Sequence, residues 1–252
     1  MNDKNNTSWG NSADWYDNLL NTDNDSYQTK VILPNVLRLL DIKKDDFILD
    51  IACGSGFFSR EFYKLSKNVT GIDISKELIN IAKTSNVDIN FYVTSADDLK
   101  FTKTKSIDKA VCILAIQNIE NVKGVLIEIN RILKDNGKMI FILNHPAFRI
   151  PKNSSWIEDK NVRARRIDEY MSESKIKIEM HPGEKNSPST ISFHRPLQYY
   201  FKLFDNTGFV VKRLEEWNSH KISQNGPRKD AEDKARREFP MFMMIEIIKN
   251  NN

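Results

Sequence analysis

The chain has 252 residues, of which 40% are hydrophobic and 29% are charged, a globular balance that excludes a fibre or a wholly disordered chain. Its 38 basic and 34 acidic residues leave a net charge of +4, an excess too small to require a nucleic-acid partner. The longest uninterrupted apolar run, Ala110 to Ile116, is far shorter than the ~20 residues that cross a bilayer. The two cysteines, Cys53 and Cys112, supply neither a disulfide framework nor a cysteine-based zinc site. The sequence therefore predicts a cytoplasmic protein, with no membrane span and no targeting signal in its polar, Asn-rich N-terminus.

The predicted elements begin with an N-terminal helical cap over residues 1–46. Its helical stretch runs from Tyr27 to Leu40, and Pro34 starts a second helix at its first turn. From Phe47 onward, short apolar runs alternate with helical patterns, which is typical of a mainly parallel sheet with crossover helices. The sequence predicts seven strands: Phe47–Ala52, Val69–Asp73, Ile89–Val93, Lys109–Ala115, Lys138–Leu143, Phe209–Glu216 and Met241–Ile248.

Three later stretches have clear helical patterns. The first, Asn121–Lys134, has an apolar face of period 3.6 and is predicted to close with Gly137 at its C′ position. The other two are 197–206, which ends before Gly208, and 228–238. Residues 144–196 are rich in proline and include the extended stretches 175–180 and 190–194. An insertion of that length favours a lid or binding element.

Together these elements predict a single α/β domain over residues 1–252, built on a doubly wound seven-stranded sheet whose last strand is reversed. Residues 1–46 form the cap, 47–143 the cofactor-binding core, 144–196 the insertion after the fifth strand, and 197–252 the C-terminal part of the core.

The loop after the first strand is the most informative stretch. Gly54 and Gly56 allow a tight turn and a close approach of backbone to a ligand, and the helix that follows points its amides at that ligand. Asp73 ends the next strand, where a carboxylate can accept both hydroxyls of a ribose, so an adenosine-containing cofactor is indicated. A dinucleotide fold gives a similar pattern. Against it, Asp50 would repel a pyrophosphate but attract an ammonium and a sulfonium, and Ser59 replaces the third glycine of the dinucleotide fingerprint.

These motifs resemble those of class I S-adenosylmethionine-dependent methyltransferases, in particular the methyltransferase type 11 group, which has a Rossmann-like fold. The family's acid-x-Gly-x-Gly-x-Gly loop is similar to residues 50–56, with Ala52 at the first glycine. Residues 71–75 resemble the second motif, 95–101 the segment that cradles adenine, 107–117 the fourth strand, and 193–197 a late segment of the group. The resemblance implies S-adenosyl-L-methionine as cofactor, bound by Asp50, Ala52, Cys53, Gly54, Gly56, Asp73, Ile74, Ser95, Ala96, Asp97 and Gln117.

The candidates for a general base are His145, His194 and Tyr27. His145 lies just beyond the fifth strand, at the edge where open α/β sheets bind ligands, although a structural histidine that caps the strand is an equal alternative. Arg195 is either a substrate clamp or a structural group, and Tyr170 is a further residue of the insertion that could contact an acceptor. The histidines share no metal-ligand spacing, so no metal is predicted.

The sequence thus predicts an enzyme that transfers a methyl group from S-adenosylmethionine to a small molecule, with the cap and the insertion forming the acceptor pocket. One alternative is a methyltransferase for RNA or protein, which the mixed charges of residues 158–177 and 228–238 disfavour. The other is a cofactor-binding partner protein that has lost catalysis. The oligomeric state and the acceptor atom are not indicated by these patterns.

Overall fold

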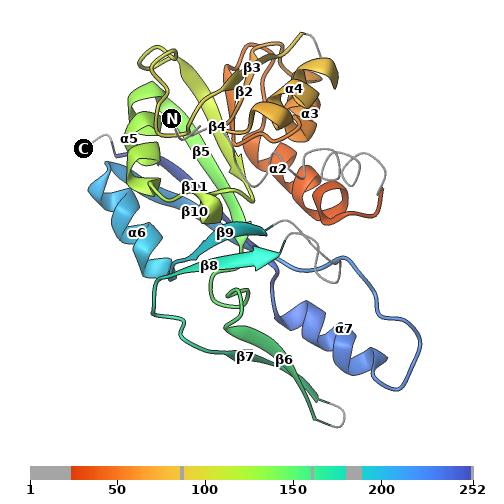
Figure 1. Ribbon diagram of the computed structural model, residues 1–252. Helices are drawn as coiled ribbons and strands as arrows, with labels where there is room; N and C mark the ends of the chain where they lie inside the picture. Colours follow the sequence, from red (N-terminus) through yellow and green to blue (C-terminus); the bar gives the residue numbers. More distant parts are fainter. Residues whose placement is uncertain (1–23, 86–87, 160–161, 180–188, 251–252) are drawn as a thin grey trace.

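A computed structural model describes residues 24–85, 88–159, 162–179 and 189–250 (Figure 1). Seven strands form one sheet in the order β10-β11-β5-β4-β1-β2-β3. They are β1 (Ile48–Ile51), β2 (Val69–Asp73), β3 (Asn90–Val93), β4 (Ile107–Ile113), β5 (Leu133–Asn144), β10 (Phe209–Trp217) and β11 (Phe242–Lys249). The first five run parallel, whereas β11 pairs antiparallel with both β5 and β10. The predicted mainly parallel sheet with a reversed last strand is confirmed.

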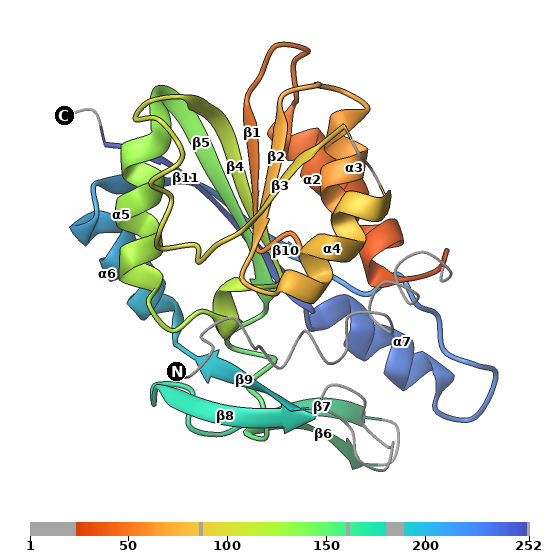
Figure 2. The same ribbon diagram turned by 45° about the horizontal axis from the view of Figure 1, so that its top comes forward.

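Helices cover both faces of this sheet (Figure 2). On one face lie α5 (Val122–Ile132) and α6 (Leu197–Asn206), and on the other α2 (Leu33–Leu40), α3 (Phe57–Tyr63) and α4 (Lys76–Ser85). Each helical layer packs its apolar side chains against the sheet in a separate core cluster. Because both faces are buried, the central strands are continuous apolar runs, and these runs are why the strands are recognisable in the sequence.

The N-terminal cap is described only from residue 24 onward. A π-helical segment, η2 (Gln28–Ile32), passes directly into α2, and Pro34 lies in the first turn of α2 as predicted. Pro34 has no N–H to donate, which is tolerated at a helix start, where the first N–H groups have no intrahelical partner. The part of the predicted cap before residue 24 lies outside the described residues.

The end of α5 differs from the prediction. Asn121 caps the start of this helix by accepting a hydrogen bond from the Gly124 amide at 3.0 Å. The helix ends at Ile132, however, and β5 begins at Leu133, whose backbone is already extended (φ −63°, ψ 140°). Gly137 therefore lies inside β5, and its predicted C′ role is wrong. Its place in the strand is tight, since a Cβ there would lie 3.0 Å from the Lys134 carbonyl oxygen.

The insertion folds as two antiparallel hairpins, β6 (Ser154–Asp159) with β7 (Val162–Ile167) and β8 (Ser174–Glu179) with β9 (Ser189–His194). The extended stretches around β8 and β9 were predicted, but the first hairpin was not. Both hairpins lie beyond the carboxyl ends of the parallel strands, beside α7 (Lys229–Glu238), as Figures 1 and 2 show. The rings of Trp156 and Phe239 meet edge to face at 5.5 Å between the first hairpin and the end of α7. Among the described residues, no helix is both long enough and apolar enough to cross a membrane.

Candidate functional site

The glycine loop between β1 and α3 turns through three residues with left-handed backbone. Ala52, Gly54 and Gly56 have φ values of 55°, 58° and 79°. Such angles cost little for glycine but about 1–2 kcal/mol for an L-residue such as Ala52. At Gly56 there is also no room for a side chain, because a Cβ would lie 2.8 Å from Cζ of Phe91. The two glycines singled out in the sequence are therefore required by the backbone of this loop.

Asp73, at the end of β2, fixes the loop in place. Its Oδ2 accepts the Gly54 amide at 2.9 Å, and its Oδ1 accepts the Ser75 amide at 2.8 Å. Burial raises the pKa of the Asp73 carboxyl, and the bonds from Ser75 and Gly54 oppose that shift. Ser75 in turn accepts the Leu78 amide at 3.3 Å, so it caps α4, a role that serine commonly has at a helix start. One carboxylate thus joins the glycine loop to the start of the next helix and retains free lone pairs for a ligand.

Asp50 lies on β1, between Gly71 and Val111 of the neighbouring strands. Its carboxylate is buried and accepts a hydrogen bond of 2.6 Å from the Ser59 hydroxyl of α3. Burial raises the pKa of Asp50 to about 7, against the opposing effect of the Ser59 bond. This carboxyl supports the loop from within the core and is not among the residues that line the cavity beside the loop.

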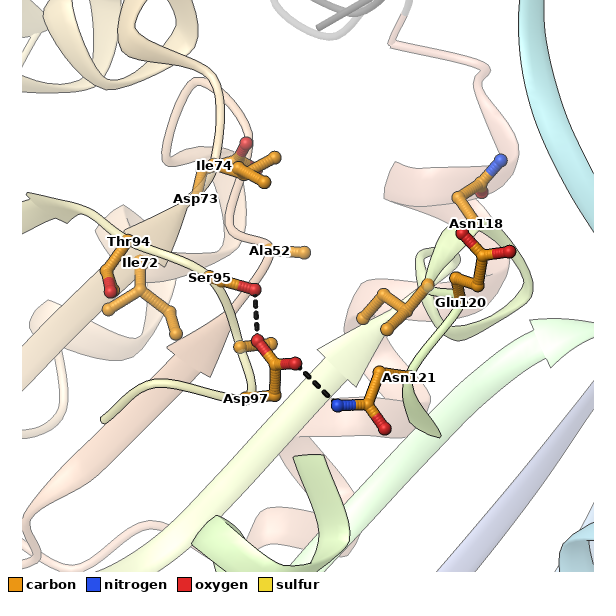
Figure 3. A pocket seen from close by; sticks show the side chains of 12 residues that line it. Ala52, Ile72, Asp73, Ile74, Thr94, Ser95, Asp97, Asn118, Glu120 and Asn121 are labelled. Atoms are coloured by element: carbon orange, nitrogen blue, oxygen red, sulfur yellow. Dashed lines mark hydrogen bonds between the residues drawn. The ribbon is translucent and has the colours of Figure 1, made fainter. Parts of the chain in front are cut away.

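A cavity of about 280 Å³ opens beside the glycine loop at the carboxyl edge of the sheet, the place where open α/β sheets bind ligands. Figure 3 shows its wall, in which Asp97 accepts hydrogen bonds from the Ser95 hydroxyl and, at 2.7 Å, from the Asn121 amide. The first of these bonds lowers the pKa of Asp97. The residues lining the cavity are Ala52, Ile72, Asp73, Ile74, Thr94, Ser95, Ala96, Asp97, Asn118, Ile119, Glu120 and Asn121.

The structure therefore brings most of the predicted cofactor residues together. Ala52, Asp73, Ile74, Ser95, Ala96 and Asp97 line the cavity, while Cys53, Gly54 and Gly56 form the backbone of the adjoining loop. Gln117 lines a different, smaller cavity. Sequence reasoning missed the segment 118–121, although its position after β4, at the carboxyl edge, could have indicated it.

His145 is fully engaged by the protein. Its Nε2 lies 2.6 Å from Oε1 of Glu216 on β10, and its Nδ1 accepts the Ala147 amide at 3.2 Å. Burial lowers the pKa of this imidazole, which favours the neutral ring with its proton on Nε2. Both ring nitrogens therefore have partners within the protein. This geometry is that of a structural histidine that caps the fifth strand, the alternative to a general base.

The other two candidate bases lie in different surroundings. His194 is buried at the end of β9, and its Nε2 donates to the Tyr170 carbonyl oxygen at 2.8 Å. The Tyr170 hydroxyl accepts the Leu197 amide at 3.0 Å, so this tyrosine connects β9 to α6. Tyr27 precedes η2, and its hydroxyl lies 3.2 Å from that of Ser219. Within the described residues, the phenolic oxygen of Tyr27 thus has one hydrogen-bond partner, the neutral Ser219 hydroxyl.

Arg195 joins the insertion to the wall of the cavity. Its guanidinium is 5% exposed and donates to the carbonyl oxygens of Ile116, Ile119 and Glu120 at 3.4, 2.9 and 3.0 Å. These three carbonyls belong to the segment that follows β4 and carries the cavity residues 118–121. Arg195 therefore holds this segment in position. Its side chain does so by donating to the backbone carbonyl oxygens of the segment.

Neither thiol nor metal chemistry is indicated in the described ranges. Cys53 and Cys112 are buried and unpaired, and burial raises the pKa of both thiols, which makes them poor nucleophiles. Within those ranges, no group of His, Cys, Asp and Glu side chains is arranged to hold a metal ion.

Residues 49–141 match the family model of the methyltransferase domain. An uncharacterised protein of Methanocaldococcus jannaschii is 38% identical over 130 residues, which are 51% of this chain and 49% of that protein. Ubiquinone biosynthesis O-methyltransferase of Xanthomonas oryzae pv. oryzae is 30% identical over 96 residues, 36% of this chain and 40% of the enzyme. The chain thus spans about half or less of the length of these relatives. The crystal structure of an S-adenosylmethionine-dependent methyltransferase from Mesorhizobium loti has a TM-score of 0.69 at 22% identity and covers 91% of this chain and 100% of its own, which shows the same fold.

Proposed function

We propose, from the premise that residues 49–141 belong to the S-adenosylmethionine-dependent methyltransferase domain family, that this protein transfers a methyl group from S-adenosylmethionine to a small-molecule acceptor. The observation that carries the proposal is the cavity of about 280 Å³ between the glycine loop and the segments after β3 and β4. Its size is close to the lower end of small-molecule sites. Asp73 supplies the one buried carboxylate on its wall.

The residues present fit an adenosine-containing cofactor. Asp73 has oxygens available for the ribose hydroxyls, Ile72 and Ile74 offer apolar surface to a base, and Asp97 and Asn118 add polar groups at the opposite wall. When bound, S-adenosylmethionine supplies an electrophilic methyl group on its sulfonium. The protein's own part is to hold the loop, through Asp73 and the left-handed backbone, and to place the acceptor in line with that methyl group.

A proton acceptor is needed only if the accepting atom is a hydroxyl oxygen. Among the three candidates, we assign this role to Tyr27, because in the part of the chain that the structure describes its hydroxyl is bonded only to that of Ser219. His145 is hydrogen-bonded to Glu216, and His194 to the Tyr170 carbonyl oxygen. We therefore propose that these two histidines hold the chain around the acceptor pocket in place. A neutral amine or a thiolate acceptor would need no base.

Three observations support a small molecule over RNA or protein. The two hairpins of the insertion lie beyond the carboxyl edge of the sheet, the edge at which the cavity opens (Figures 1 and 2). The net charge of +4 is small. A curated relative of part of the chain acts in ubiquinone biosynthesis. The two unpaired thiols also fit the reducing cytoplasm, where we propose that the protein works.

The first test is ligand binding measured by thermal shift. S-adenosylmethionine and its demethylated product should stabilise the protein, by about 2.7 kcal/mol at 100 times the dissociation constant, and NAD should not. The second test incubates the protein with labelled S-adenosylmethionine and a cell extract, and we expect the label to enter small metabolites. Label in RNA or protein would favour the alternative substrates, and binding without any label transfer would favour the inactive partner protein.

A matched pair of variants controls both tests. Ile74→Trp enlarges a 40%-exposed side chain on the cavity wall and should abolish binding and transfer. Ile127→Trp makes the same change at a 52%-exposed position on α5 and should leave both unchanged. Equal behaviour of the two variants would contradict the assignment of this cavity to the cofactor.

A further inference from the structure

A second, smaller cavity carries an arginine that no described residue neutralises. Arg149 follows the turn after β5, where its amide donates to the His145 carbonyl oxygen at 2.8 Å. Its side chain lines a cavity of about 30 Å³ and is partly buried. Over the described ranges, its guanidinium has neither a hydrogen-bond acceptor nor a carboxylate partner, and burial lowers its pKa. A guanidinium that is partly desolvated and unpaired is costly unless a ligand compensates it.

The charges around Arg149 increase this imbalance. A neighbouring cation, Arg165, donates to the Phe148 carbonyl oxygen at 2.8 Å and to the Ser154 hydroxyl at 2.7 Å, without a carboxylate partner in the described parts of the chain. Burial lowers the pKa of the neighbouring His145, which favours its neutral form. By contrast, Arg163 of the same hairpin lies 3.4 Å from Glu232. Within the described ranges, the guanidinium of Arg149 thus has a cationic neighbour and no carboxylate paired with it, while the Glu216 carboxylate is bonded to His145.

The same cavity holds an unsatisfied acceptor. The Gln117 side chain donates through Nε2 to the Leu114 carbonyl oxygen at 2.6 Å, which fixes the orientation of its amide. Its Oε1 is buried and has no hydrogen-bond partner among the residues that the structure describes, although buried polar atoms almost always have one. Gln117 and Arg149 therefore present, on one small cavity, an acceptor that lacks a donor and a cation that lacks an anion.

The cavity is also close to the cofactor site. Gln117 and Asn118 are consecutive residues of the short helix η3 (Ile116–Asn118), so their Cα atoms are about 3.8 Å apart. Gln117 lines the small cavity, and Asn118 lines the cofactor cavity. The two cavities are therefore lined by consecutive residues of one short helix.

We propose, on the basis of the methyltransferase function above, that Arg149 and Gln117 anchor the carboxylate end of an acidic small-molecule acceptor. The guanidinium pairs with the carboxylate through its planar set of N–H donors. Gln117 Oε1 accepts from a hydroxyl or N–H group adjacent to that carboxylate. The cavity of about 30 Å³ is small, so we propose that it takes the terminal carboxylate alone and that the body of the acceptor lies toward the cofactor.

The first experiment asks whether Arg149 contacts the acceptor or the cofactor. Calorimetry compares S-adenosylhomocysteine with methylthioadenosine, which lacks the amino-acid carboxylate, on the wild type, Arg149→Gln and Arg166→Gln. Arg166 is a matched control, since it lies on the same insertion, is 60% exposed and pairs with Asp168 at 2.8 Å. We expect each ligand to bind the wild type and the two variants with the same affinity. A loss of affinity confined to S-adenosylhomocysteine in Arg149→Gln would show that Arg149 binds the cofactor carboxylate and would overturn the proposal.

The second experiment identifies the acceptor class. The small molecules of a cell extract are separated by anion exchange into acidic and non-acidic pools before reaction, and each pool is then incubated with labelled S-adenosylmethionine and enzyme. We expect label from the acidic pool only. Arg149→Gln should reduce this labelling roughly ten- to a hundredfold, as for a lost hydrogen bond to a charged group, while Arg149→Lys should retain part of it and Arg166→Gln all of it.

The outcomes separate this proposal from the function on which it rests. Label from the non-acidic pool alone, or undiminished labelling by a folded Arg149→Gln protein, overturns the acidic acceptor and leaves the methyltransferase function standing. Label from neither pool overturns both. A melting temperature of Arg149→Gln close to that of Arg166→Gln verifies that the variant is folded.

Discussion

Replacing Asp73 with alanine removes the acceptor that joins the glycine loop to the start of α4. Its two oxygens accept the Gly54 and Ser75 amides at 2.9 and 2.8 Å, and the residue is 8% exposed. Bonds to a charged group contribute about 1.5–3 kcal/mol each, so the loss of both costs about 3–6 kcal/mol. Burial of the Asp73 carboxylate is itself unfavourable, which is why it raises the pKa of this group. The alanine variant no longer buries a carboxylate, and this offsets part of the cost. We therefore expect the free energy of unfolding to fall by about 2–4 kcal/mol.

Asp73→Asn should keep one of the two hydrogen bonds and remove the other. Its single carbonyl oxygen can accept one amide, while its NH2 group is then directed at the other N–H donor. The loss should therefore be about 1.5–3 kcal/mol, less than for alanine. Both variants should also bind S-adenosylhomocysteine more weakly than the wild type, because the loop is no longer held in its binding geometry.

The assay is urea denaturation followed by circular dichroism, with calorimetry of S-adenosylhomocysteine under conditions where each variant is folded. Asp98→Ala is the control, since the Asp98 side chain is 52% exposed and its ion pair with Lys100 lies at the surface; its effect should stay within about 0.5 kcal/mol. An Asp73→Ala protein as stable as Asp98→Ala would refute the reasoning, because the two buried bonds would then contribute nothing to the fold.

Three further changes test other parts of the site. Ala52→Gly should raise the free energy of unfolding by about 0.5 kcal/mol in thermal melts, because relief of the left-handed backbone at φ 55° outweighs the added freedom of the unfolded chain; a lower melting temperature would contradict this. Arg195→Gln should destabilise the fold by about 3 kcal/mol and weaken cofactor binding, since it leaves the carbonyls of segment 116–120 without their donor; a variant with wild-type stability would show that Arg195 does not hold this segment. For Asp50, the folded pKa of about 7 lies above the ordinary 3.8, so the folded protein retains a proton that the unfolded chain releases, and stability falls as the pH rises from about 4 to 7. Asp50→Asn should remove that part of the slope, and equal slopes in denaturation series of both proteins would be evidence against a buried, protonated Asp50.

The sequence by itself determined the sheet and the cofactor side of the site. Strands buried on both faces must be continuous apolar runs, and a loop with left-handed residues requires glycine at positions such as Gly56, so both leave a local signature. For the same reason, the neighbouring residues in the sequence are enough to place Asp73 at a strand end and Ser75 at a helix cap. These features depend on a few consecutive residues, and such residues can be read without knowledge of the rest of the chain.

Only the tertiary structure decided the roles of the residues around the acceptor. His145 is committed to Glu216, 71 positions later, and Arg195 to carbonyls 75 to 79 positions earlier. No local pattern reveals such partners, so the candidate base and the possible clamp could not be told from structural groups in the sequence. The first hairpin of the insertion was missed for the same reason, because its strands are half-exposed and charged and are supported by Phe239 near the end of α7. Arg149 has no motif around it at all; its significance comes from the absence of a nearby carboxylate, which depends on how distant segments pack.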